Sequence, residues 1–223
     1  MERNNRKILD YSFLTLGLLV QVVTYFISNS LSPGSLTPLS LISGLLGICS
    51  VCLASQGNIL TYLFGFGQVG TYMALIVSQR FYGQIALNTF YLITMIYGVY
   101  VWKNRLHADS RHVTPRQLRL PVMIVIAVST LVLSWIAGWG MESWTQHKQP
   151  YLDAYTTIPA LVAQVLMILV YREHWFVWLA VDVLNVVLWL RAGDYCMTAQ
   201  YVFWCANCLY GLKRWKKLSA SDF

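Results

Sequence analysis

The feature that most constrains the fold is a series of eight apolar stretches, each close to the roughly 20 residues that cross a bilayer as an α-helix. They cover approximately residues 9–28, 36–55, 58–79, 83–102, 120–140, 155–171, 174–192 and 196–213. Of the whole chain, 57% is hydrophobic and only 11% is charged, whereas soluble domains carry about 25% charged residues. The connecting loops are short, so little unpaired backbone falls within the apolar layer. The sequence therefore predicts an all-α, multi-pass membrane protein with eight transmembrane helices.

The basic residues are distributed unevenly between the loops. Thirteen of the 16 Lys and Arg residues lie in the N-terminus, in loops that follow even-numbered stretches, or in the C-terminus; the others are Arg80, Lys148 and Arg191. Because basic residues mark the cytoplasmic side of a membrane protein, both termini are predicted to be cytoplasmic. The same distribution explains the net charge of +7 without a nucleic-acid partner.

One stretch carries polar and apolar residues on different faces. At about 100° per residue, Trp175, Trp178, Asp182, Asn185 and Trp189 fall within an arc of roughly 80° on a helix. An ionisable residue inside a membrane helix is costly and indicates a functional site. Indole rings attract cations, so this face is predicted to bind a flat, cationic organic molecule, with Trp175, Trp178, Asp182 and Asn185 as candidate substrate-binding residues.

Aromatic and amide side chains on neighbouring stretches are further candidate substrate-binding residues. They are Tyr62, Tyr72, Gln84, Asn88, Tyr91, Gln200, Trp204 and Asn207. The amides, together with Gln164, have an alternative role in hydrogen bonds between helices, and the aromatic residues have an alternative role in the core. His174 beside Glu173 is expected to form a solvated pair at a helix boundary.

The sequence offers little for catalysis or for metal binding. It contains no H-E-x-x-H and no G-x-S-x-G motif. Two pairs among the five Cys residues have C-x-x-C spacing, but no His or acidic residue lies nearby in these apolar stretches, so we expect packing residues. We therefore expect no metal or cofactor. A transporter is the main interpretation, and its alternatives are an intramembrane enzyme and a receptor that binds its ligand without transporting it.

The pattern Y-G-x-x-x-W-K occurs at 97–103 and again at 210–216, an offset of 113 residues. The same offset places the stretch 58–79 on 174–192, with Val69 on Asp182. We therefore expect two parallel three-helix repeats, as in transporters that bind their substrate between repeats. Trp102 and Trp215, each followed by Lys, are expected to belong to an aromatic belt at the membrane interface.

This organisation divides the chain into predicted segments. They are a cytoplasmic N-terminus with an extra helix (1–38), a first three-helix repeat (39–103), a basic loop with a linker helix (104–140), an external loop (141–154), a second repeat (155–216) and a cytoplasmic tail (217–223).

Three motifs resemble the Pnu family of bacterial vitamin transporters. They are Q-G-N-x-x-x-Y-x-x-G from Gln56, L-N-x-x-Y-x-x-x-x-x-Y-G-x-Y-x-W from Leu87, and W-x-x-W-x-x-x-D from Trp175. The resemblance covers roughly residues 40–216. It implies a three-one-three fold similar to the SWEET sugar transporters, and facilitated diffusion without ion coupling across the bacterial inner membrane. It also implies a homotrimer, and a cytoplasmic kinase or pyrophosphokinase that traps the vitamin.

The resemblance leaves two main substrates, thiamine and nicotinamide riboside. The nicotinamide riboside members of the family carry Asn at the position of Asp182. An Asn amide both donates and accepts hydrogen bonds, whereas a carboxylate only accepts and favours a cation or an amino group. We therefore expect thiamine, with nicotinamide riboside as the alternative, and riboflavin or a nucleoside as remote ones.

Overall fold

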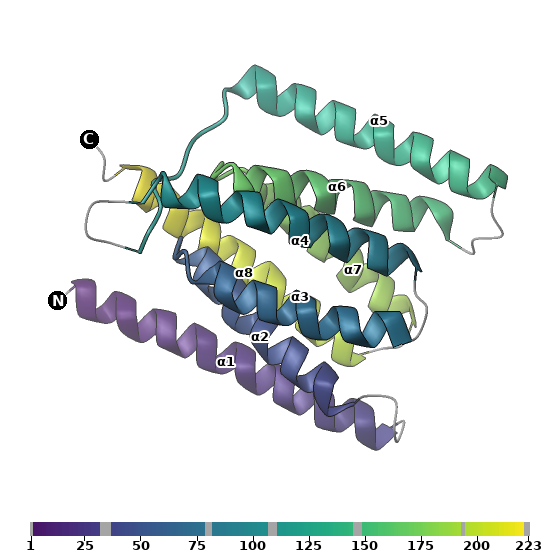
Figure 1. Ribbon diagram of the computed structural model, residues 1–223, viewed down its shortest axis with the longest axis horizontal. Helices are drawn as coiled ribbons and strands as arrows, with labels where there is room; N and C mark the ends of the chain where they lie inside the picture. The colour runs from purple at the N-terminus through teal and green to yellow at the C-terminus, as the bar shows by residue number, and fades with distance from the viewer. Residues whose placement is uncertain are drawn as a thin grey trace.

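The computed structural model describes residues 2–31, 37–78, 82–106, 111–144, 149–192 and 195–220. In these ranges the chain folds into eight helices (Figure 1). Their bounds are α1 (Glu2–Leu31), α2 (Pro38–Ser55), α3 (Thr61–Ser78), α4 (Tyr82–Lys103), α5 (Leu120–Trp144), α6 (Pro150–Ile168), α7 (His174–Ala192) and α8 (Tyr195–Ala220). The prediction of an all-α protein is confirmed, and each predicted stretch overlaps one helix.

Six helices in the described part of the chain are long and apolar enough to cross a membrane, namely α1, α2, α4, α5, α6 and α7. Helices α3 and α8 do not meet this criterion over their described residues. Helix α8 is the more polar of the two, since it carries amides and a basic C-terminal end. A multi-pass membrane protein is therefore supported by six helices, and membrane crossing by α3 and α8 stays a prediction.

The helices form a bundle in which α5 lies apart from the centre (Figure 1). Helix α5 packs on α6, and α1 packs on α2 and α8. Helix α2 contacts α8, and α4 contacts α6, so these two contacts join the group α2–α4 to the group α6–α8. Helix α1 begins and α8 ends at the same end of the bundle (Figure 1), where Asp10 accepts a hydrogen bond from Tyr210 and pairs with Arg214 at 3.5 Å.

The turn between α2 and α3 has the same backbone geometry as the turn between α6 and α7. Gly57 has a φ of +70° and Val170 a φ of +63°, a left-handed conformation that suits glycine and strains a β-branched residue. The N–H of each residue donates to the carbonyl three positions earlier, on Ala54 at 2.8 Å and on Met167 at 3.0 Å. The two turns are separated by the predicted offset of 113 residues.

The segment between α4 and α5, residues 111–118, is hydrogen bonded to both turns. The carbonyl of Gly57 accepts from the N–H of Val113 at 2.9 Å, and the carbonyl of Val170 accepts from the N–H of Arg116 at 2.7 Å. Val113 and Val170 are fully buried. This connecting segment therefore joins the two turns at the end of the bundle where α1 begins.

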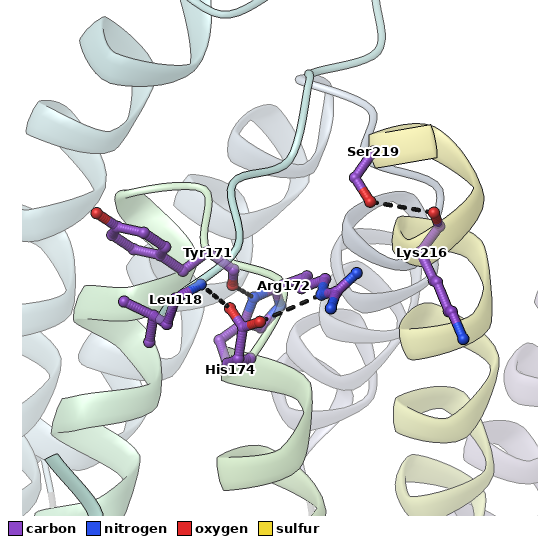
Figure 2. Close-up of polar contacts among 7 residues, drawn as sticks. Leu118, Tyr171, Arg172, His174, Lys216 and Ser219 are labelled. Atoms are coloured by element: carbon purple, nitrogen blue, oxygen red, sulfur yellow. Dashed lines mark hydrogen bonds and ion pairs between the residues drawn. The ribbon is translucent and has the colours of Figure 1, made fainter. Parts of the chain in front are cut away.

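Glu173 and His174 are buried at this end, so the expectation of a solvated pair is wrong. The Glu173 carboxylate accepts hydrogen bonds from the backbone N–H of Leu118 at 3.1 Å and from Nε of Arg172 at 3.2 Å (Figure 2). Nδ1 of His174 donates to the carbonyl of Tyr171 at 2.7 Å. A buried acid is tolerated here because these donors compensate its lost hydration.

Trp102 and Trp215 are fully buried, so their assignment to an interfacial belt is also wrong. The indole N–H of Trp102 donates to the carbonyl of Met167 at 3.1 Å, and that of Trp215 donates to the carbonyl of Ala54 at 2.9 Å. The two rings meet edge to face, with centroids 5.8 Å apart. Each tryptophan thus lies in the last helix of one group and bonds to a helix of the other group.

Candidate functional site

A cavity of about 520 Å³ lies between the two helix groups. Its lining residues come from α2, α3, α4, α6, α7 and α8, and not from α1 or α5 within the described residues. Pockets that bind small organic molecules typically measure about 300–1,000 Å³. The cavity is therefore large enough for a vitamin, and it lies where the sequence predicts a substrate between two repeats.

Eight of the twelve sequence-predicted site residues line this cavity. They are Trp175, Trp178, Asp182 and Asn185 of α7, Tyr62 and Tyr72 of α3, Tyr91 of α4, and Trp204 of α8. Residues more than 100 positions apart in the sequence thus line one cavity, and on each helix they belong to the face identified from the helical period.

The remaining four residues are not part of the described lining. Asn88 is buried in α4, and Gln200 is half-buried in α8. Asn207 is fully buried, and its amide nitrogen lies 3.5 Å from the carbonyl of Val51 in α2, which fits the alternative role of joining helices. Gln84 lies in the first turn of α4, and its side chain is outside the described residues.

Asp182 is the one ionisable acid among the described lining residues, which include no Lys, Arg or His. Its side chain is 5% exposed. The thiol of Cys208 donates a hydrogen bond to its Oδ2 at 3.3 Å. A buried carboxylate without a positive partner is costly. A cationic ligand in the cavity would supply that partner.

Two aromatic walls of the cavity are held in place by glycines on the adjacent helices. Tyr62 packs against Gly98 and Trp175 packs against Gly211, and neither glycine has room for a Cβ atom. The Tyr62 hydroxyl, the Trp175 N–H and the Trp204 N–H are buried without a hydrogen-bond partner among the described residues. Buried donors are usually paired, so these three groups are exceptions, and the Tyr62 hydroxyl lies against Gly98.

Two lining amides were not among the predicted site residues. Gln68 of α3 shares a helix face with Gly65 and Tyr72, and Gln164 of α6 shares one with Ala160. Their positions three or four residues from other lining residues were the available signal, but that spacing does not distinguish a ligand contact from a contact between helices. The cavity also includes Tyr201, Trp189, Thr156, Thr157, Ser50 and Thr61.

Asn185 has part of its hydrogen-bonding capacity satisfied within its own helix. Its amide nitrogen donates to the carbonyl of Val181 at 2.9 Å. This bond fixes the orientation of the amide and leaves the oxygen as the group that can accept from a ligand.

No group of three or more His, Cys, Asp or Glu residues that could hold a metal ion occurs in the part of the chain that the structure describes.

Comparisons with known proteins give a consistent result. A family model described as nicotinamide mononucleotide transporter matches residues 37–217. A relative from Haemophilus influenzae, named nicotinamide riboside transporter PnuC, is 32% identical over 184 residues, which cover 81% of this chain and 80% of the relative. A protein with the same name from Neisseria mucosa is 29% identical over 81% of this chain and 72% of its own length. Another from Escherichia coli is 23% identical over 76% of this chain and 81% of its own length.

One solved structure is similar over nearly the whole chain. It is described as the crystal structure of the vitamin B3 transporter PnuC. It matches with a TM-score of 0.76 and 26% sequence identity, and the match covers 96% of this chain and 92% of that chain.

Proposed function

This chain belongs to the nicotinamide mononucleotide transporter family, and on that premise we propose that it takes up nicotinamide riboside by facilitated diffusion. The resemblance to the Pnu family is confirmed, and the relatives are transporters rather than enzymes. Their names favour nicotinamide riboside, the alternative substrate, over the expected thiamine. The expectation of thiamine rested on Asp182 alone, and a carboxylate also suits nicotinamide riboside because its pyridinium ring is cationic.

The observation that carries this proposal is the lone carboxylate of Asp182 in an aromatic cavity. The pyridinium ring stacks on Trp175 and Trp178, where the indole faces attract its charge. The Asp182 carboxylate lies near the ring and neutralises it. Gln68 and Gln164, which line the cavity, pair with the carboxamide or the ribose, since an amide both donates and accepts. Asn185 contributes its amide oxygen, while Asn88, Gln84 and Gln200 stay predicted polar contacts.

The proposed architecture has eight membrane crossings. A first unit (α2–α4) and a second unit (α6–α8) are parallel repeats, α5 is the linker helix and α1 is the extra helix. The support is a set of features that recur at the offset of 113 residues. They are the left-handed turns at Gly57 and Val170, the indole hydrogen bonds of Trp102 and Trp215, and the contacts of Gly98 with Tyr62 and of Gly211 with Trp175.

Both termini are proposed to be cytoplasmic, because the basic residues concentrate on that side and α1 begins at the end where α8 finishes (Figure 1). Trp102 and Trp215 then close the cytoplasmic end of the cavity. Release of the substrate requires the two units to separate there, while the opposite end closes. A homotrimer in the bacterial inner membrane, and a cytoplasmic kinase or pyrophosphokinase that traps the substrate, complete the proposal.

Uptake into liposomes that contain the purified protein tests this function. Labelled nicotinamide riboside should equilibrate into the lumen at a saturable rate, and a pH gradient should not change the final level. Excess unlabelled nicotinamide riboside should compete, whereas excess thiamine should compete weakly. Flux of thiamine alone would overturn the substrate. Saturable binding without internal accumulation would indicate a receptor and overturn transport.

A further inference from the structure

The contact between Cys208 and Asp182 joins two helices inside the cavity. Asp182 belongs to α7 and Cys208 to α8, and both side chains are buried while lining the same space. The thiol lies 3.3 Å from Oδ2, and no hydrogen bond to Oδ1 is found among the described residues. One carboxylate oxygen is thus held by the protein, and the other is free to accept from a ligand.

The first unit has no polar contact at the corresponding place. Subtracting the offset of 113 residues converts Asp182 to Val69 and Cys208 to Met95, which also line the cavity. In the first unit, the apolar Val69 on α3 is matched by Met95 on α4, whose thioether cannot donate a hydrogen bond. In the second unit, the carboxylate of Asp182 on α7 is matched by Cys208 on α8, whose thiol is a donor. The thiol is thus present in the unit that has the carboxylate.

We propose that Cys208 is a positioning residue for substrate binding, whose thiol fixes the Asp182 carboxylate so that its second oxygen faces the cationic substrate. This inference rests on the proposed function. A carboxylate that is already oriented loses less side-chain freedom when the substrate binds, and such preorganisation raises affinity. A thiol is a weak donor, so it holds the carboxylate in place while leaving the negative charge available to the cation.

The test measures the Kd for nicotinamide riboside by calorimetry on the purified full chain, together with uptake into liposomes. Cys208→Val keeps an apolar side chain of similar size but removes the donor, and should raise the Kd about three- to tenfold. Cys208→Ser keeps a donor and should stay closer to the wild-type Kd. Cys205→Val is the matched control, because Cys205 lies on the same helix and is not part of the described cavity lining.

A double-mutant cycle separates positioning from packing. If Cys208 acts through Asp182, Cys208→Val should have no further effect on the Kd in an Asp182→Asn background. An unchanged Kd in the Cys208→Val single variant would overturn the inference. An equal loss in both backgrounds would also overturn it, because packing alone would then explain the effect. Failure of the wild-type chain to bind or take up nicotinamide riboside would instead overturn the proposed function.

Discussion

The first and second units are built alike at the end of the bundle where α1 begins, and differently where they face the cavity. Both have a left-handed turn after the first helix, a glycine against a buried ring, and a terminal tryptophan that bonds to the other unit. In the cavity, residues matched at the offset of 113 differ in chemistry. The pairs include Tyr62 and Trp175, Gly65 and Trp178, Gln68 and Val181, Val69 and Asp182, Tyr72 and Asn185, Tyr91 and Trp204, and Met95 and Cys208.

This difference separates the requirements of folding from those of recognition. The shared features are backbone hydrogen bonds and close packing, which hold the units together. The unshared features place the carboxylate and four indoles on the second unit, together with the amide of Asn185. The first unit has no acid or indole in the described lining and contributes tyrosines and the amide of Gln68. Gly65 occupies the position at which the second unit has the bulky Trp178, and the side chain of Met95 packs against this glycine.

The largest effect is expected from making the two units alike at the carboxylate. Asp182→Val reproduces the residue found at position 69 and removes the only acid of the described lining. Loss of one partner of a buried charge pair costs about 3 kcal/mol, so uptake of nicotinamide riboside at low concentration should fall about 100-fold. The measurement is the initial rate of uptake into liposomes.

Val183→Ala, on the exposed side of α7, is the control for that variant and should retain wild-type uptake. Near wild-type uptake by Asp182→Val would show that the carboxylate does not recognise the substrate. The difference between Val69 and Asp182 would then have no role in recognition of the substrate.

A smaller effect is expected at the two buried tryptophans, where the units match. Trp102→Phe and Trp215→Phe each remove one indole donor and leave a buried carbonyl of Met167 or Ala54 without its partner. Each change should destabilise the protein by about 2 kcal/mol and lower the melting temperature in detergent by several degrees. The two shifts should be similar.

Trp135→Phe, on the exposed face of α5, should leave the melting temperature unchanged. A large shift for one of the two buried tryptophans and none for the other would break the comparison, since only one unit would then depend on its indole bond.

The smallest effect is expected at the turns. Gly57→Ala places a side chain in a left-handed conformation and next to Leu218, which should cost about 1 kcal/mol. The counterpart Val170 already occupies such a conformation and is fully buried. Chemical denaturation in detergent would measure this change in the free energy of unfolding. Equal stability of Gly57→Ala and wild type would show that the first turn tolerates a side chain in this conformation, as the second turn does.

The helices and much of the cavity could be predicted from the sequence, since both follow from local patterns. Long apolar runs indicate helices, and a helical period brings Trp175, Asp182 and Asn185 to one face. The offset of 113 residues then matched Tyr62 with Trp175 and brought their helices to a common centre. These inferences needed no knowledge of how the helices pack.

The remaining features depend on contacts between distant parts of the chain. Trp102 and Trp215 sit beside lysines, as belt residues do, and their acceptors belong to helices of the other unit. Glu173 is buried because Leu118, far away in the sequence, supplies a donor. The period of a helix likewise does not show whether Gln164 or Asn207 faces a cavity or another helix, because both surfaces are buried.

The hydrogen bonds of segment 111–118 also constrain the order in which the chain can assemble during synthesis. The carbonyl of Gly57 can meet the N–H of Val113 only after α3 and α4 have been made, and Arg116 can meet Val170 only after α6 has followed. The indole of Trp215 reaches Ala54 last of all. This end of the bundle is therefore completed only when α8 has been made, so a chain truncated before α8 would leave the carbonyl of Ala54 in α2 without its indole partner.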